Sequence, residues 1–166
     1  MNCPRTTTRR NSAATPRSGV VALEVILSLP ILIIGVVGVL QFGVFFANAQ
    51  VLNQACRVGA LEASHQTLAA AIPSAVTDAI DHQLAPAGIT RCYVRMEHNV
   101  GGGTTVVTNG TCTCGPTTNL SPTPAGDYVR ITVCVEVTDL MPNALQYYGL
   151  DFSNQHASCT TVYRVE

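Results

Sequence analysis

The side chains best able to do chemistry in this 166-residue chain are its cysteines. Six of the seven follow residue 47, and an even number of cysteines in a small exported domain is typical of disulfides. Spacing alone does not choose between the possible pairings. Cys56 lies in a segment expected to be helical, so it either joins a partner in the chain, stays free or bonds between chains. The disulfide candidates are Cys56, Cys92, Cys112, Cys114, Cys134 and Cys159.

A zinc site is the alternative use of these residues. Cys112, Cys114, His98 and His156 carry ligand atoms that zinc takes, but no C-x-x-C pair is present, so disulfides are the preferred interpretation. The chain has no glycine-rich phosphate loop with lysine, no HExxH and no G-x-S-x-G motif. We therefore expect that the protein is not an enzyme and that it holds no metal and no cofactor.

The charged residues of the C-terminal two thirds suggest a solvated surface. Asp78 and Asp81 lie three residues apart on an expected helix, which indicates a solvent-facing side of that helix. The chain contains no lysine, and its later arginines are scattered among acids. Nothing indicates a nucleic-acid surface.

One acid stands inside a long apolar run. From Val20 to Ala47 the strongly polar residues are Glu24 and Gln41. The run would extend ~42 Å as a helix at ~1.5 Å per residue, more than the ~30 Å hydrocarbon core of a bilayer. No polar side recurs with helical period, which predicts a transmembrane helix in contact with membrane lipid. A carboxylate there costs on the order of 2–3 kcal/mol, so Glu24 either lies near the interface or has a partner.

Basic residues set the expected orientation. Residues 1–19 hold four arginines and no acid, and basic residues beside a span stay in the cytoplasm. This predicts a cytoplasmic basic leader at 1–19, a transmembrane helix at 20–47 and an extracytoplasmic α+β domain at 48–166. A cleaved secretory signal is the alternative, with Ala47-Asn48-Ala49 as its site and Gln50 as the mature start. The run is longer than a typical ~7–15-residue signal core and contains an acid, which argues against it.

Beyond the apolar run the pattern predicts two helices. Helical character continues through Asn48–Ala71, a segment rich in Ala, Leu and Gln. Pro73 interrupts it, and Ser74 is the expected N-cap of a second helix, Ala75–Leu84.

Alternating apolar residues then predict a small antiparallel sheet. Strands are expected at Arg91–Glu97, Tyr128–Thr138 and Ala157–Val165, with a short strand at Thr104–Thr108 inside the loop-rich stretch 99–126. The fold class is therefore α+β, with a long N-terminal helix leaning on the sheet. The residues expected to share the core face of the strongest strand are Val129, Ile131, Val133, Val135 and Val137.

The start of the apolar run resembles that of type IV prepilins and pseudopilins. A basic leader containing Arg17 ends in Gly19, and an acid, Glu24, is the fifth residue of the helix that follows. More narrowly, residues 19–64 are similar to the TadE-like family of the tight-adherence pilus system, and DYVRITVCVEVTDLMP and SCTTVYRVE resemble its late strands. Val25 departs from the aromatic residue that the family usually has. The matching positions are Gly19, Glu24, Pro30, Gly43 and Gly59-Ala60.

This resemblance implies a pilin-like fold and a structural role. It implies that a prepilin peptidase cuts between Gly19 and Val20, and that Glu24 meets the new terminal amine of a neighbouring subunit. The protein would be a minor pseudopilin-like subunit for assembly of a Tad or type IV-like pilus or secretion pseudopilus. Its partners would be other pilin or pseudopilin subunits and the inner-membrane assembly platform.

The implied location is the bacterial inner membrane, crossed once with the N-terminus in the cytoplasm, and then the pilus. Two other hypotheses remain open at this point. The chain could be a tethered binding module, held by disulfides and recognising a ligand through the loop at 99–126, or a secreted form of that module.

Overall fold

The computed structural model describes residues 18–66, 71–100, 103–112, 114 and 126–165. Its contacts divide the chain into two compact units, Met1–Val36 and Val37–Glu166. Most of the expected basic leader lies outside the described residues, as do parts of the loop-rich stretch 99–126.

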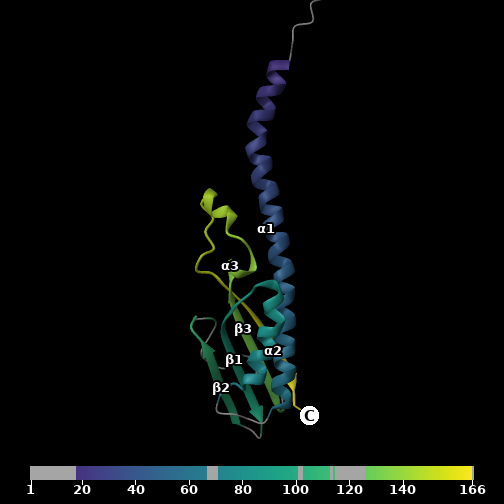
Figure 1. Cartoon of the computed structure of the whole chain (residues 1–166), viewed down its shortest axis with the longest axis vertical. Coiled ribbons are helices and arrows are strands. Elements are labelled where there is room, and N and C mark those ends of the chain that lie inside the picture. The colour runs from purple at the N-terminus through teal and green to yellow at the C-terminus, as the bar shows by residue number, and fades with distance from the viewer. Residues whose placement is uncertain (1–17, 67–70, 101–102, 113, 115–125, 166) are drawn as a thin grey trace, which may run out of the picture. The chain divides into compact units, whose positions relative to one another are not determined.

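A single helix, α1, runs from Ser18 to His65 (Figure 1). It includes the apolar run, where Pro30 is accommodated within the helix, and continues through the Ala- and Gln-rich segment that follows. The helix was predicted to reach Ala71, but it ends at His65, and residues 67–70 lie outside the described part. Within the described residues, α1 is the one helix long and apolar enough to cross a membrane, with an 18-residue window of mean hydropathy 2.8.

The unit Val37–Glu166 contains a four-stranded antiparallel sheet. Its strands are β1 (Arg91–Val100), β2 (Gly103–Gly110), β3 (Tyr128–Glu136) and β4 (His156–Arg164), in the order β2-β1-β3-β4. The predicted α+β plan, a long N-terminal helix with a small antiparallel sheet, is confirmed. The strand predicted at Thr104–Thr108 is longer than expected, because β1 and β2 form a hairpin that occupies much of the stretch predicted to be loop.

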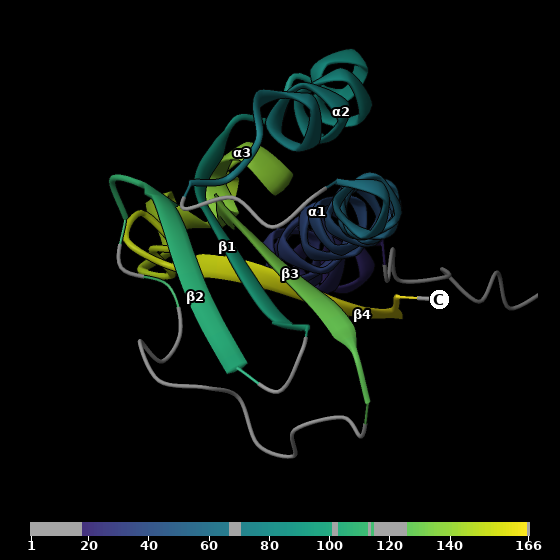
Figure 2. The ribbon, with the colours of Figure 1, turned by 90° about the horizontal axis from the view of Figure 1, so that it is seen from below.

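The C-terminal part of α1 and the helix α2 (Ser74–Leu84) cover the same face of this sheet (Figure 2). Along β3 the odd-numbered residues Val129–Val135 point to the helices, as their alternation predicted. From β1, Val94 and Met96 join them, while Cys92 lies at an irregularity in the pairing of β1 with β3. This apolar core also includes Leu52, Ala55, Cys56, Ala60, Ala63, Val76, Ile80 and Leu84.

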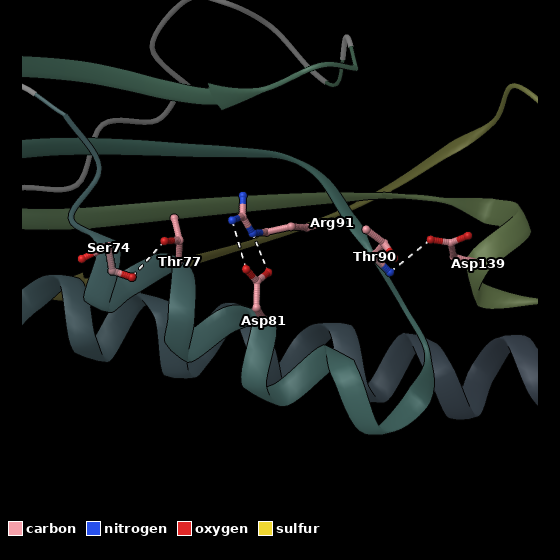
Figure 3. A network of polar contacts seen from close by, with 6 residues as sticks. All are labelled: Ser74, Thr77, Asp81, Thr90, Arg91 and Asp139. Atoms are coloured by element: carbon pink, nitrogen blue, oxygen red, sulfur yellow. Dashed lines mark hydrogen bonds and ion pairs between the residues drawn. The ribbon is translucent and has the colours of Figure 1, made fainter.

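Polar contacts attach α2 to the strand that follows it. Asp81 accepts two hydrogen bonds from the Arg91 guanidinium, at 2.6 and 3.0 Å (Figure 3). The predicted N-cap is wrong: Pro73 occupies that position without a side-chain cap, and Ser74 is the first helical residue. Thr77 Oγ1 instead donates to the Ser74 carbonyl at 2.8 Å.

The strand predicted at Tyr128–Thr138 ends at Glu136, before the last residues of its apolar alternation. Val137 begins a short helix, α3 (Val137–Leu140), rather than extending β3. Its backbone N–H donates to the Gln155 carbonyl at 2.9 Å, and Asp139 accepts a hydrogen bond from the Thr90 N–H at 3.1 Å (Figure 3). These contacts fix the chain reversal that leads through the 3-10 helix η2 (Ala144–Tyr148) to β4. A shorter 3-10 helix, η1 (Ala85–Ala87), follows α2.

Gly59 is the position on α1 where the helix packs tightly against Ile80 of α2. A Cβ added there would be 2.7 Å from Ile80 Cγ1 and 2.8 Å from Ile80 Cδ1, whereas one added at Gly43 would meet nothing within 4 Å. We therefore expect Gly59→Val to lower the free energy of unfolding of the C-terminal unit by ~1–3 kcal/mol through overpacking. Thermal unfolding of the detergent-solubilised full chain, followed by near-ultraviolet circular dichroism of its tyrosines, measures this loss.

The matched control is Gly43→Val, which makes the same change on the same helix in open space. It should leave the melting temperature close to that of the parent chain. Equal melting temperatures for the two variants would show that the contact at Gly59 is not tight.

Candidate functional site

The N-terminal part of α1 presents an apolar surface with one carboxylate. Glu24 is exposed, and so are its apolar neighbours Val20, Val21, Leu23 and Val25. Gly19 and Val20 follow Ser18, the first residue of the helix. The structure thus places the proposed cleavage site at the helix start, one turn before Glu24.

The two polar residues of the apolar run have different surroundings. Gln41 is 4% exposed, and its Nε2 donates a hydrogen bond to the Pro142 carbonyl. Glu24 has no hydrogen bond or ion pair with any residue in the described part of the chain. Packing within the described part of the chain therefore accounts for Gln41 but not for Glu24. In lipid, a carboxylate at such a position needs a partner from another molecule or access to the interface.

Two disulfides hold one end of the sheet. Cys92 at the start of β1 is bonded to Cys112 after β2, with 5.5 Å between their Cα atoms. Cys114 is bonded to Cys134 in β3, with 6.2 Å between Cα atoms. Each bond closes a loop with a sequence separation of 20, and closure of loops near this length stabilises a fold by ~3 kcal/mol in the chain-entropy model.

The other two candidate cysteines are buried thiols that contact each other. Cys56 on α1 donates a hydrogen bond to the Cys159 carbonyl of β4 at 3.1 Å, and the protonated Cys159 thiol donates to Asn53 Oδ1 at 3.0 Å. The Cys56 thiol stabilises a thiolate on Cys159 and, with Thr161 and Arg57, lowers the pKa of Cys159 to about 7. The same contact, together with burial, raises the pKa of Cys56. These contacts therefore favour a thiolate on Cys159 over one on Cys56.

This asymmetry predicts a pH-dependent labelling pattern. In the folded chain with both thiols reduced, alkylation of Cys159 by iodoacetamide should increase as the pH rises through about 7, while Cys56 stays unlabelled. Cys56→Ala removes the thiol that donates to Cys159. The pH at which alkylation of Cys159 increases should therefore rise toward 9.0, the ordinary pKa of a cysteine thiol. Peptide mass spectrometry assigns the label to each cysteine. A transition at the same pH in both proteins would contradict the proposed hydrogen bond.

The sheet face opposite the helices buries a charged cluster that the sequence did not suggest. Glu97 on β1 is 1% exposed and lies between Arg95 and Arg130, with N–O distances of 3.2 and 3.3 Å. Tyr128 donates its hydroxyl hydrogen to Glu97 Oε1 at 2.8 Å. Burial, followed by the contact with the Glu97 carboxylate, raises the pKa of Tyr128, so its hydroxyl stays protonated below pH 10.

Strand register brings this cluster together. Glu97 pairs with Arg130 and Asn99 pairs with Tyr128, so residues far apart in sequence become neighbours across β1 and β3. Alternation in β3 predicted Arg130 and Thr132 on the face away from the core, but both are buried. The prediction of one buried face was therefore incomplete.

Neutralising Glu97 should destabilise the domain strongly. Glu97→Gln keeps the size of the side chain but leaves Arg95 and Arg130 buried without the carboxylate, and breaking a buried ion pair costs ~3–5 kcal/mol. Chemical denaturation of the full chain in detergent measures the loss. The control is Asp81→Asn, because the side chain of Asp81 is 48% exposed and such pairs contribute only ~0–1 kcal/mol. Equal midpoints for the two variants would count against a structural role of the cluster.

The structure brings Cys112 and His156 of the zinc alternative together but gives Cys114 and His98 other surroundings. Cys114 is bonded to Cys134, and His98 shares the helix-covered face of β1 with Val94 and Met96. Burial lowers the pKa of His98, which favours a neutral imidazole. Among the described residues, one group with ligand atoms within 4.8 Å of one another comprises Cys92, Cys112 and His156. Its two sulfurs are joined in a disulfide, so neither offers a thiolate.

Asp81 and Arg91 also line a surface hollow of about 560 Å³ next to the disulfide at Cys92. Asp81 was expected on a solvated face of its helix, and its side chain is 48% exposed, but its ion pair with Arg91 was not predicted. Asp78, three residues earlier, is exposed as expected. The sequence could not predict this ion pair because it does not show the path of the chain after α2, which brings Arg91 back to the side of α2 that carries Asp81.

Comparison with known proteins identifies the first part of the described chain. No curated protein and no solved structure matches the chain. A family model described as TadE-like protein matches residues 19–61, the segment that carries Gly19, Glu24, Pro30 and Gly59. This match confirms the resemblance expected for the helix, and the segment 19–61 is similar to TadE-like proteins, whereas the likeness expected for the late strands lies outside the match.

Proposed function

We propose that this chain is a minor pseudopilin-like structural subunit of a Tad or type IV-like pilus or secretion pseudopilus. The observation that carries the proposal is Glu24, an exposed carboxylate in an exposed apolar helix, inside the segment that matches the TadE-like family. The role is structural: the subunit contributes its helix to an assembly and does not catalyse a reaction.

Processing would create the group that Glu24 needs. A prepilin peptidase cuts the peptide bond between Gly19 and Val20 and releases the basic leader. The new α-amine of Val20 carries a positive charge at neutral pH. Placed beside Glu24 of a neighbouring subunit, it offsets the desolvation of the carboxylate, which by itself costs on the order of 2–3 kcal/mol in the bilayer. Helices packed in this register are favoured over isolated ones.

The proposed location follows from the same segment. The chain resides in the bacterial inner membrane as a single-pass protein, with residues 1–19 in the cytoplasm, residues 20–47 in the bilayer and residues 48–166 outside. Its partners are membrane lipid, the prepilin peptidase, other pilin or pseudopilin subunits and the inner-membrane assembly platform.

Glu24→Ala tests the assembly role. We expect the variant to insert into the membrane and fold normally but to be lost from sheared filaments and from span-to-span crosslinks, because the carboxylate no longer pairs with a neighbour. Leu27→Ala, which truncates another exposed side chain of the same helix, is the control and should assemble like the parent. Normal incorporation of Glu24→Ala would refute the role of this carboxylate.

The mature N-terminus, measured in cells that contain the secretion apparatus, tests the processing step. The proposal requires Val20 as the first residue of the membrane-bound form. A soluble form that starts at Gln50 would replace the proposal with a secreted module. An intact leader on a membrane-bound chain without ordered helix contacts would replace it with a tethered binding module.

A further inference from the structure

The segment between β3 and β4 exposes aromatic and apolar side chains beside α1. Tyr147 is 94% exposed, and Tyr148 and Leu150 are exposed as well. No charged residue lies between Asp139 and Asp151. We call residues 142–150 the β3–β4 loop. Neighbouring exposed aromatic and apolar side chains are a feature of surfaces that contact proteins or membranes.

Hydrogen bonds from α1 fix the position of this loop along the helix. Gln41 donates to the Pro142 carbonyl, and Asn48 Nδ2 donates to the Leu140 carbonyl at 2.8 Å. Met141 and Phe152, which flank the loop, line a hollow of about 400 Å³ together with Phe42 of α1. The loop is therefore attached at the end of the apolar run of α1, and both lie within the unit Val37–Glu166.

The length of the apolar run places this attachment at the membrane surface. The run from Val20 to Ala47 is ~12 Å longer than the ~30 Å hydrocarbon core, a surplus of about eight residues at ~1.5 Å each. Counted from the arginine-bearing end, that surplus falls near residues 40–47, where the loop is attached. Phe42 and Phe46 of this stretch are exposed too.

The loop also has internal contacts that hold its base. Asn143 Nδ2 donates to Asp151 Oδ1 at 2.8 Å, and the Ser153 N–H donates to the same oxygen at 2.9 Å. Hydrogen bonds from the Ser153 hydroxyl and N–H, and then from Asn143, lower the pKa of Asp151, so the first charge after the loop is retained at neutral pH. The two tyrosines therefore lie in a loop whose base is closed by hydrogen bonds to the charged residue Asp151.

We propose that the β3–β4 loop is a second membrane contact, in which Tyr147, Tyr148 and Leu150 lie in the interfacial region of the outer leaflet beside α1. Tyrosine suits this region because its ring is apolar and its hydroxyl can bond to headgroups and water. The partner is the lipid surface itself. The contact limits the tilt of α1 and holds the domain against the membrane before assembly. It rests on α1 spanning the bilayer, which is part of the proposed function.

The chain contains no tryptophan, so single substitutions give an unambiguous test. The full chain carrying Tyr147→Trp is placed in phosphatidylcholine vesicles whose acyl chains are brominated either near the headgroup or near the chain end. We expect a blue shift on insertion and loss of fluorescence with the headgroup-proximal bromines. Tyr163→Trp on β4 is the matched control, and it should be quenched by aqueous iodide and not by brominated lipid.

Ile33→Trp, in the apolar run, reports the membrane span separately. The loop contact is supported when bromines near the chain end quench the tryptophan at position 33 and bromines near the headgroup quench the tryptophans at positions 147 and 148. If the tryptophan at position 33 is quenched by lipid but those at 147 and 148 behave like the one at 163, the loop contact is overturned and the span stands. If the tryptophans at 147 and 148 are shielded from iodide only at high protein density and are not quenched by brominated lipid, a second copy of the chain covers the loop and the membrane contact is overturned. Failure at position 33 removes the span and the loop contact together.

Discussion

The structure depends on one stripe of small side chains that lets α1 approach the sheet and α2. Ala55, Cys56, Ala60 and Ala63 recur with helical spacing and are buried, and Gly59 stands among them against Ile80. Because these side chains are short, the helix can pack against the sheet and bury the valines of β3. Larger residues on this stripe would separate the layers, and every contact of the core would weaken.

The two faces of the sheet are stabilised by different physics. The face under the helices is apolar and gains from removing carbon surface from water. The opposite face buries Glu97 between two arginines and depends on hydrogen-bonding geometry and on matched charge. Buried ion pairs add little net stability but penalise any register in which they separate. The cluster therefore acts against slippage of β1 along β3, and the disulfides restrict the opposite end of this strand pair, where Tyr93 pairs with Cys134.

Local patterns in the sequence predicted the structural features that depend on residues close together in the chain. The apolar run gave α1, and alternation gave the core face of β3. Contacts that depend on tertiary geometry were not predictable: the Asp81–Arg91 pair, the Glu97 cluster and the turn at Val137 all require knowledge of where a distant segment lies. The cysteines show the same limit, because their spacing was compatible with many pairings and the structure leaves Cys56 and Cys159 as thiols. Gly19 and Glu24 stood out because they do not fit the pattern of their own segment.

This last point separates the residues that stabilise the domain from those that carry the proposed function. The core, both disulfides and the charged cluster all belong to the unit Val37–Glu166. Gly19, Val20 and Glu24 precede it, and neither Val20 nor Glu24 is buried by the described chain. Folding of the domain therefore gives no reason for an acid at position 24, whereas Gln41 is explained by its bond to Pro142. A carboxylate that is costly in lipid and has no partner in the described part of the chain needs either a partner from another molecule or access to the interface.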